Sequence, residues 1–124
     1  MGRKKILIVD DEQNIRILVS SMLGKDYTVI GASDGEEAID IARSQKPDFI
    51  LMDILMPKVD GYIACHAIKT DPATKAIPVV MLTAVGYELN KRLAEEVGAD
   101  GYITKPFSPQ DLLDTIDRCV TKPK

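Results

Sequence analysis

The chain has 124 residues, a length typical of one domain, which we expect to span residues 1–124. Apolar residues make up 45% and charged residues 28%, a balance that excludes a disordered tail, a collagen-like repeat and a coiled-coil rod. The net charge of −3 is a poor match for a phosphate backbone, so we expect no direct nucleic-acid binding by this domain. No apolar run is long enough for a membrane span or a signal peptide, which predicts a cytoplasmic protein without membrane contact.

Three short apolar runs and two helical patterns fill the first half of the chain. The runs predict strands at 6–9, 27–30 and 48–52. After the first run, apolar residues recur at helical spacing and end before Gly24: Ile15, Leu18, Val19, Met22 and Leu23. The sequence Ser33-Asp34-Gly35-Glu36 has the pattern of a capping box and predicts the start of a second helix.

The second half repeats this alternation. Asp60-Gly61 opens a helical pattern with Ile63, Ala64, Ala67 and Ile68, and strands are expected at 79–82 and 101–103. Between those strands, Leu89, Leu93, Ala94 and Val97 predict a helix. Ser108-Pro109 supplies an N-cap and a proline at the first position of the last helix.

Five strand–helix pairs in strict alternation predict an α/β fold, with a doubly wound parallel sheet covered by helices on both faces. The strands are apolar along their whole length, as expected when both faces are buried. Cys65 and Cys119 are too few for a disulfide framework, so we expect reduced, structural thiols.

Polar residues follow four of the five predicted strands: Asp10 and Asp11, Asp53, Thr83, and Lys105. Singly, an Asp here often caps a helix, a Thr bonds its own turn and a Lys is solvated. Ligands of open parallel sheets bind outside the carboxyl ends of the strands, so the five together predict a site at that edge.

The chemistry of this set favours phosphoryl transfer. Three carboxylates held close together repel one another, and a divalent cation and the Lys105 ammonium would relieve the repulsion. An open acidic site with few ligands suits Mg²⁺. A carboxylate nucleophile beside Mg²⁺ and a lysine can accept a phosphoryl group as an acyl phosphate.

Four segments resemble the receiver domain of bacterial two-component response regulators, including its chemotaxis members: residues 6–12, 53–61, 82–84 and 98–107. The resemblance covers essentially the whole chain, with every motif in the right order. It implies a flavodoxin-like (βα)5 fold with strand order 2-1-3-4-5. It also implies a signalling phosphoacceptor rather than an enzyme, one that catalyses only its own phosphorylation and dephosphorylation.

The resemblance assigns a role to each site residue. Asp53 is the implied phosphate acceptor, and Asp10, Asp11, Asp53 and the Leu55 carbonyl are the implied ligands of Mg²⁺, or of Mn²⁺ in its place. The Lys105 ammonium pairs with the phosphoryl oxygens, and the bond before Pro106 is cis. Thr83 bonds the phosphoryl group, and Tyr102 is the aromatic switch that turns inward as Thr83 moves.

The implied phosphoryl donor is a sensor histidine kinase or a histidine phosphotransfer protein, docking on the first helix and the loop 105–108. The implied output acts through the face formed by helix four, strand five and helix five, toward an effector protein, a fused output domain or a phosphorylation-dependent homodimer. The only histidine, His66, is expected to be an ordinary surface or partly buried side chain. Whether the chain is a complete regulator or part of a larger one stays open.

Three alternatives fit less well. A phosphatase or phosphotransferase of haloacid-dehalogenase type needs a general-acid Asp two residues past its nucleophile, where this chain has Leu55. A receiver that only docks partners would not need the intact acidic set, and no Gly-x-Gly-x-x-Gly follows the first strand to bind a dinucleotide. Leu55 and Val85, two residues past Asp53 and Thr83, cannot orient a hydrolytic water, which predicts slow self-dephosphorylation.

Overall fold

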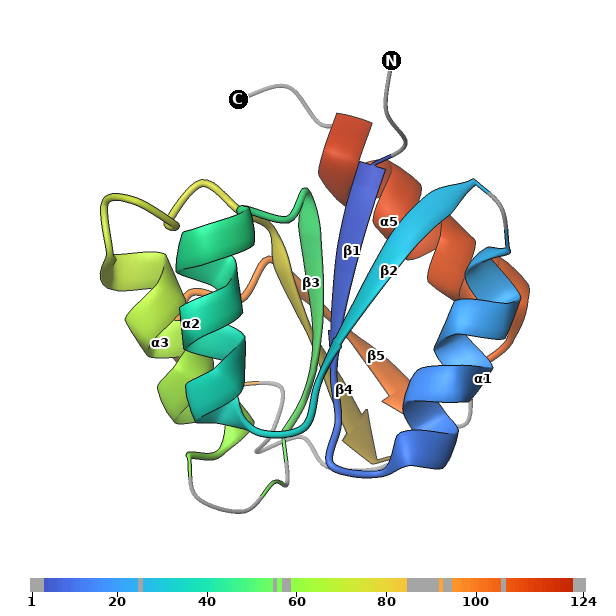
Figure 1. The fold of residues 1–124 in the computed structure, drawn as a ribbon, viewed down its shortest axis with the longest axis horizontal. Coiled ribbons are helices and arrows are strands. Elements are labelled where there is room, and N and C mark those ends of the chain that lie inside the picture. The colour runs from blue at the N-terminus through green and yellow to red at the C-terminus, as the bar shows by residue number, and fades with distance from the viewer. Residues whose placement is uncertain are drawn as a thin grey trace.

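Five parallel strands form one sheet with helices on both faces (Figure 1). The computed structural model describes residues 4–24, 26–54, 56, 59–84, 92, 95–105 and 107–121, with the backbone alone at 83, 84, 105, 120 and 121. The strands are Lys4–Val9 (β1), Tyr27–Ala32 (β2), Phe49–Asp53 (β3), Val79–Ala84 (β4) and Gly101–Lys105 (β5). Their order is β2-β1-β3-β4-β5, which confirms the expected topology.

The helices pack in two pairs. They are Gln13–Leu23 (α1), Gly35–Gln45 (α2), Gly61–Thr70 (α3) and Pro109–Thr121 (α5). In Figure 1, α1 and α5 lie on one face of the sheet, and α2 and α3 lie on the other. Most of the predicted helix at 89–97 lies outside the described residues, although Arg92, Glu95 and Glu96 have helical backbone.

The sheet separates two apolar cores. One lies under α2 and α3 and includes Leu7, Ile50 and Met81, while the other lies under α1 and α5 and includes Ile8, Leu51 and Leu82. Alternate residues of each strand therefore pack into opposite cores, which explains why the strand sequences are continuously apolar.

Two large residues of the predicted apolar stripes are exposed to solvent. Leu18 on α1 is 45% exposed and Ile63 on α3 is 58% exposed. The helix surface that faces the sheet is narrower than the apolar stripe. On α1 it buries Val19 and Leu23, which leaves Leu18 at its margin.

The helix starts follow the sequence, with one correction. At α2 the cap is Asp34 rather than Ser33: the Asp34 side chain accepts from the Glu37 N–H at 2.8 Å. The Glu37 carboxylate in turn accepts from the Ser33 N–H at 2.7 Å, so the reciprocal pattern is shifted by one residue from the expected one. The expected helix starts at Asp60 and Ser108 are confirmed, because each side chain accepts from a backbone N–H three residues later.

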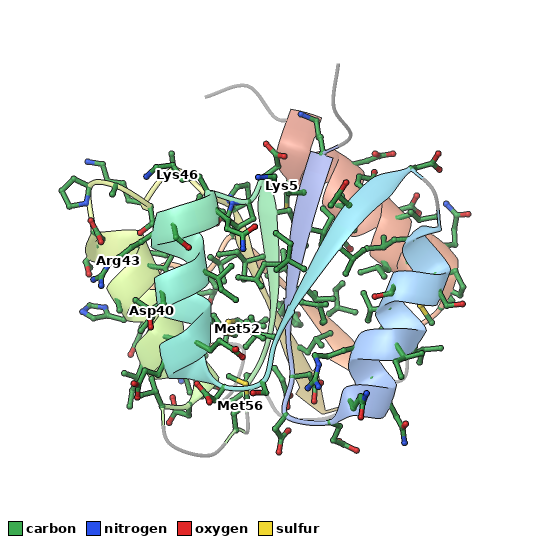
Figure 2. The ribbon with its side chains drawn as sticks, viewed as in Figure 1. Lys5, Asp40, Arg43, Lys46, Met52 and Met56 are labelled. Atoms are coloured by element: carbon green, nitrogen blue, oxygen red, sulfur yellow. The ribbon has the colours of Figure 1, made fainter. Side chains whose placement is uncertain are left out.

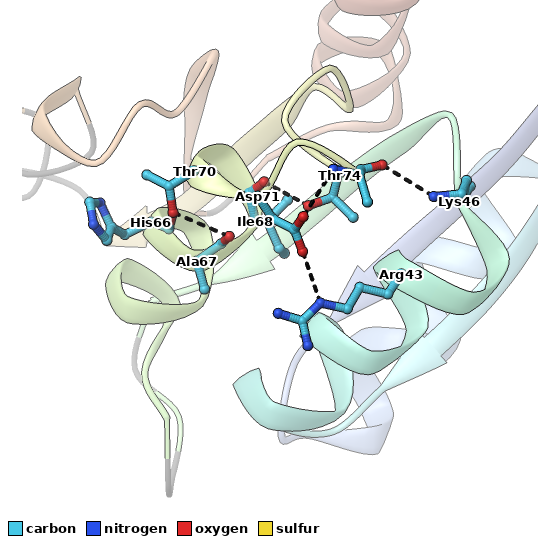
Figure 3. Close-up of polar contacts among 9 residues, drawn as sticks. Arg43, Lys46, His66, Ala67, Ile68, Thr70, Asp71 and Thr74 are labelled. Carbon is cyan, nitrogen blue, oxygen red and sulfur yellow. Dashed lines mark hydrogen bonds and ion pairs between the residues drawn. The ribbon is translucent and has the colours of Figure 1, made fainter.

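Two basic side chains, Lys5 and Lys46, lie near the end of the sheet where the strands begin. Figure 2 shows them there, with Arg43 further along α2 and Met56 near the other end of the sheet. In Figure 3, Arg43 and Lys46 reach from α2 to the segment after α3, where Arg43 pairs with Asp71 and Lys46 donates to the Ala73 carbonyl. Within the described part of the chain, no helix has the length and apolar character needed to traverse a lipid bilayer.

Candidate functional site

The register of the sheet brings the predicted site residues to one edge, which we call the carboxyl edge and define by Asp10, Asp53, Thr83 and Lys105. Val9 of β1 pairs with Met52 of β3, so Asp10 and Asp53 are the next residues on neighbouring strands. Neighbouring strands lie about 5 Å apart, which sets the separation of these two backbones.

The other half of the carboxyl edge comes from β4 and β5. Asp53 pairs with Leu82, so Thr83 is one residue further along β4. Ala84 pairs with Lys105 at the end of β5. The backbones of Asp10, Asp53, Thr83 and Lys105 therefore lie at the same edge of four adjacent strands, as the sequence predicts, with Thr83 one residue and Lys105 two residues beyond the level of Asp53.

Two carboxylates of this edge are withdrawn from solvent. Asp10 is fully buried and Asp53 is only 7% exposed. Burying a carboxylate costs free energy unless it is hydrogen-bonded, paired with a cation or bound to a metal. Two buried carboxylates on adjacent strands are therefore strong candidates for a functional site.

The turn after β1 is fixed by hydrogen bonds to Asp10. The Asp10 N–H donates to the Ala32 carbonyl on β2 at 3.1 Å, which extends the strand pairing by one residue. The Asp10 carboxylate accepts from the Glu12 N–H at 2.9 Å, and this contact closes the turn that leads into α1.

Three consecutive acidic residues form a group that could hold a cation. Asp10, Asp11 and Glu12 each offer a carboxylate oxygen, and these oxygens lie within 4.8 Å of one another. Glu12 is the member that sequence reasoning missed, although the acidic run Asp10-Asp11-Glu12 was a visible signal. Asp11 and Glu12 are exposed, so the group is partly open to water. Hard carboxylate oxygens in such a position fit a hydrated Mg²⁺.

Arg16 was also missed. It lies on α1 between two apolar residues, and its Nη1 donates to the backbone carbonyl of Asp10 at 2.5 Å. A guanidinium therefore sits beside the acidic turn. No spacing rule would single out this arginine, because the contact depends on how α1 packs against β1 and β2.

The remaining predicted site residues are only partly described. Tyr102 lies on β5 with its side chain 37% exposed. Leu55, Val85 and Pro106 lie outside the described residues, as do the side chains of Thr83 and Lys105, so the roles expected of them stay predictions.

The cysteines and His66 lie away from this chemistry, as expected. Cys65 is buried in the core under α2 and α3, and burial raises the pKa of its thiol to about 12. Cys65 and Cys119 are not joined in a disulfide bond. His66 is exposed on α3, and Figure 3 shows its ring pointing away from the neighbouring contacts.

Comparison with known proteins agrees with this geometry. Residues 6–117 match the family model described as the response regulator receiver domain. The chain is 46% identical over 110 residues to the alkaline phosphatase synthesis transcriptional regulatory protein PhoP of Bacillus subtilis (strain 168), covering 88% of this chain and 45% of PhoP. This chain spans less than half the length of the curated relatives it matches.

Solved structures share the whole fold. A putative response regulator from Chloroflexus aurantiacus J-10-fl is 35% identical with a TM-score of 0.94, covering 98% of this chain and 100% of that one. The receiver domain of the sensor histidine kinase PA1611 from Pseudomonas aeruginosa PAO1 has a TM-score of 0.90 at 29% identity, covering 98% of this chain and 100% of that one. That structure has a magnesium ion coordinated in its active-site cleft.

The sheet order, the acidic edge and the match over residues 6–117 lead to one conclusion. The chain belongs to the response regulator receiver domain family, the phosphoacceptor modules of two-component signalling.

Proposed function

We propose that Asp53 is the residue of this chain that accepts the phosphoryl group. The supporting observation is that Asp53 is nearly buried and lies level with Asp10 at the carboxyl edge. In the proposed reaction, a carboxylate oxygen of Asp53 attacks the phosphorus of a phosphohistidine on the partner protein. The new P–O bond forms as the P–N bond breaks, and the imidazole leaves with the bonding electron pair and takes up a proton from solvent.

The acidic turn after β1 is the proposed cation site. Asp10 and Asp11, with Asp53 and the Leu55 carbonyl, would hold Mg²⁺ or Mn²⁺, and the position of Glu12 adds a further carboxylate within reach. When bound, the cation neutralises charge on the phosphoryl oxygens. In this proposal the turn at Asp10 presents carboxylate oxygens to the cation. Lys105 and Thr83 contact the phosphoryl oxygens.

Exposed apolar residues on α1 support docking of the phosphoryl donor there. Ile17 is 58% exposed and Leu18 is 45% exposed. Adjacent exposed apolar side chains are typical of a protein-binding surface. A histidine kinase or a histidine phosphotransfer protein is the proposed partner.

The proposed output surface includes β5 and α5. Tyr102 lines a shallow hollow there together with Asp114, Asp117 and Arg118. Phosphorylation of Asp53 adds charge and acceptor oxygens at the carboxyl edge, which shifts an equilibrium between two arrangements of this face. An effector protein, a fused output domain or a second phosphorylated copy would bind the favoured arrangement.

Incubation with acetyl phosphate and Mg²⁺, read by intact mass, tests the acceptor. We expect a gain of one phosphoryl group in the parent protein and none in Asp53→Asn, because the amide is not a nucleophile. Asp40→Asn, which replaces an exposed carboxylate on α2, is the matched control and should be phosphorylated like the parent. Phosphorylation of Asp53→Asn at the parental rate, or none in the parent, would contradict the proposal.

A further inference from the structure

The side chain of Arg16 follows a defined path from α1 to the acidic turn. Its Nη1 contacts the Asp10 carbonyl, and its stem passes over β2 at Gly31. A Cβ at Gly31 would lie 3.3 Å from the Arg16 Cδ, closer than such contacts normally are. The missing side chain at Gly31 thus provides the space that the Arg16 stem occupies.

The location of Arg16 is electrostatically unusual for a helix. It lies one turn into α1, and the first turn contains no acidic residue. A cation near the N-terminus of a helix meets the positive end of the helix dipole, which is ordinarily unfavourable. The acidic residues lie just before the helix instead, in the group Asp10, Asp11 and Glu12, whose backbone Arg16 contacts at the Asp10 carbonyl.

We propose that Arg16 is a built-in counter-cation of this acidic group, and that its charge and a bound Mg²⁺ offset the same carboxylate repulsion. This inference rests on the proposed cation site. It follows that Arg16 stabilises the metal-free protein and weakens Mg²⁺ binding, because the guanidinium repels the incoming dication. Lys105 supplies a further positive charge at this edge by its place in the sequence.

Magnesium titration calorimetry on Arg16→Gln tests the sign of this effect. We expect Arg16→Gln to bind Mg²⁺ about three- to tenfold more tightly than the parent, from the loss of a repulsion between a single and a double charge several ångströms apart. Arg16→Lys, which keeps the charge, should stay within about twofold of the parent. Arg43→Gln makes an equal charge change on α2, where Arg43 pairs with Asp71, and its Mg²⁺ affinity should also stay within about twofold of the parent.

Two further measurements separate charge from geometry. At about 1 M salt the Debye length falls to about 3 Å, so the difference between Arg16→Gln and the parent should largely disappear. In urea unfolding, Arg16→Gln should lose more stability in EDTA than in saturating Mg²⁺. The difference between the two conditions should match the change in Mg²⁺ affinity by linkage.

Weaker or unchanged Mg²⁺ binding by Arg16→Gln would overturn the inference, because it would make Arg16 a purely geometric support of the turn. If Arg16→Gln does not fold, Gly31→Val is used in its place. The valine side chain displaces the Arg16 stem, while the arginine charge stays in the molecule. The inference then requires that Gly31→Val bind Mg²⁺ more tightly than the parent. Failure of the parent to bind Mg²⁺ would instead contradict the proposed function.

Discussion

Two glycines fix the backbone that follows the proposed acceptor. The Gly61 N–H donates to the Ile54 carbonyl at 2.9 Å, and the Gly35 N–H donates to the Val59 carbonyl at 3.2 Å. A Cβ at Gly61 would overlap the Asp53 carbonyl oxygen, and one at Gly35 would overlap the Val59 carbonyl oxygen. Gly61 therefore holds the Ile54 backbone in place, and Gly35 holds the Val59 backbone.

Gly61→Ala should disturb Asp53 through this contact. The added methyl group forces the backbone apart, so we expect a loss of about 1–3 kcal/mol in the free energy of unfolding, measured in urea. Phosphorylation by acetyl phosphate should slow as well, because the carbonyl that must move belongs to the proposed acceptor itself.

Gly101→Ala is the matched control for this substitution. A Cβ at Gly101 would meet Val80 Cγ2 at 3.7 Å, an ordinary van der Waals contact. Equal stabilities and equal phosphorylation rates for the two alanine variants would contradict the argument from close approach.

At the residue scale, the sequence predicted the candidates whose signal is local. Asp10 and Asp53 directly follow apolar runs, so their place at the end of a strand could be predicted. Arg16 and Gly31 could not be predicted in this way. Their roles depend on how α1 crosses β2, and neither the spacing nor the type of these residues specifies that crossing.

At the element scale, ion pairs join α2 and α3 to the loops at the end of the sheet where the strands begin. Arg43 Nε lies 2.9 Å from Asp71 Oδ2 (Figure 3). Lys69 on α3 contacts both Asp100 before β5 and the Ile77 carbonyl before β4, each at 2.9 Å. These contacts tie the end of α3 to two successive strands.

The Asp71 contacts make part of the stability depend on pH. A hydrogen bond from the Ala73 N–H, followed by the one from Arg43, lowers the pKa of Asp71 below its ordinary value of 3.8. A carboxyl group whose pKa is lower in the folded protein stabilises it above the unfolded pKa, and this stability is lost as the pH falls through the folded pKa.

Asp71→Asn should therefore be less stable than the parent at pH 7, and the difference should shrink as the pH falls from about 4 toward 2. The asparagine still accepts from the Ala73 N–H, so the loss reports on the charge. Urea unfolding of both proteins at each pH measures the difference, with Asp40→Asn as the control. A difference that stays constant with pH would contradict this assignment.

Element boundaries show which local signals were sufficient. The starts at Asp60 and Ser108 were predicted because each sequence offers one suitable cap. At α2, Ser33 and Asp34 compete, and Asp34 caps the helix because Glu37 is placed to bond back to the Ser33 N–H. The exposure of Leu18 and Ile63 depends on the width of the packed surface, which periodicity does not specify.

At the scale of the whole molecule, the strand order follows from the family resemblance, whereas the sequence itself predicts only a doubly wound parallel sheet. Alternation of strands and helices is consistent with several strand orders. What the sequence does predict is that Asp10, Asp53, Thr83 and Lys105 share one edge, because the ends of parallel strands all face the same way. The register confirms this for their backbones.

The duration of the phosphorylated state is a property of the molecule that the sequence predicts. Leu55 and Val85 have apolar side chains that cannot orient a water by hydrogen bonding. We expect slow hydrolysis of the acyl phosphate, with most of the phosphorylated protein persisting well beyond seconds. Intact mass measured over time after removal of acetyl phosphate tests this, and complete loss within seconds would refute it. Leu55→Asp, which adds a group able to hold a water, should shorten the lifetime.

The strands and the last helix run in opposite directions, so the proposed acceptor and the end of α5 lie at opposite ends of the sheet. The strands deliver Asp10 and Asp53 to one pole, while α5 runs back and finishes at the opposite pole, near the start of β1 (Figure 1). A domain joined after α5 would be attached at the end of the sheet opposite to Asp53. Phosphorylation at Asp53 would therefore affect the attachment point of such a domain through the elements between them, which include β5 and α5.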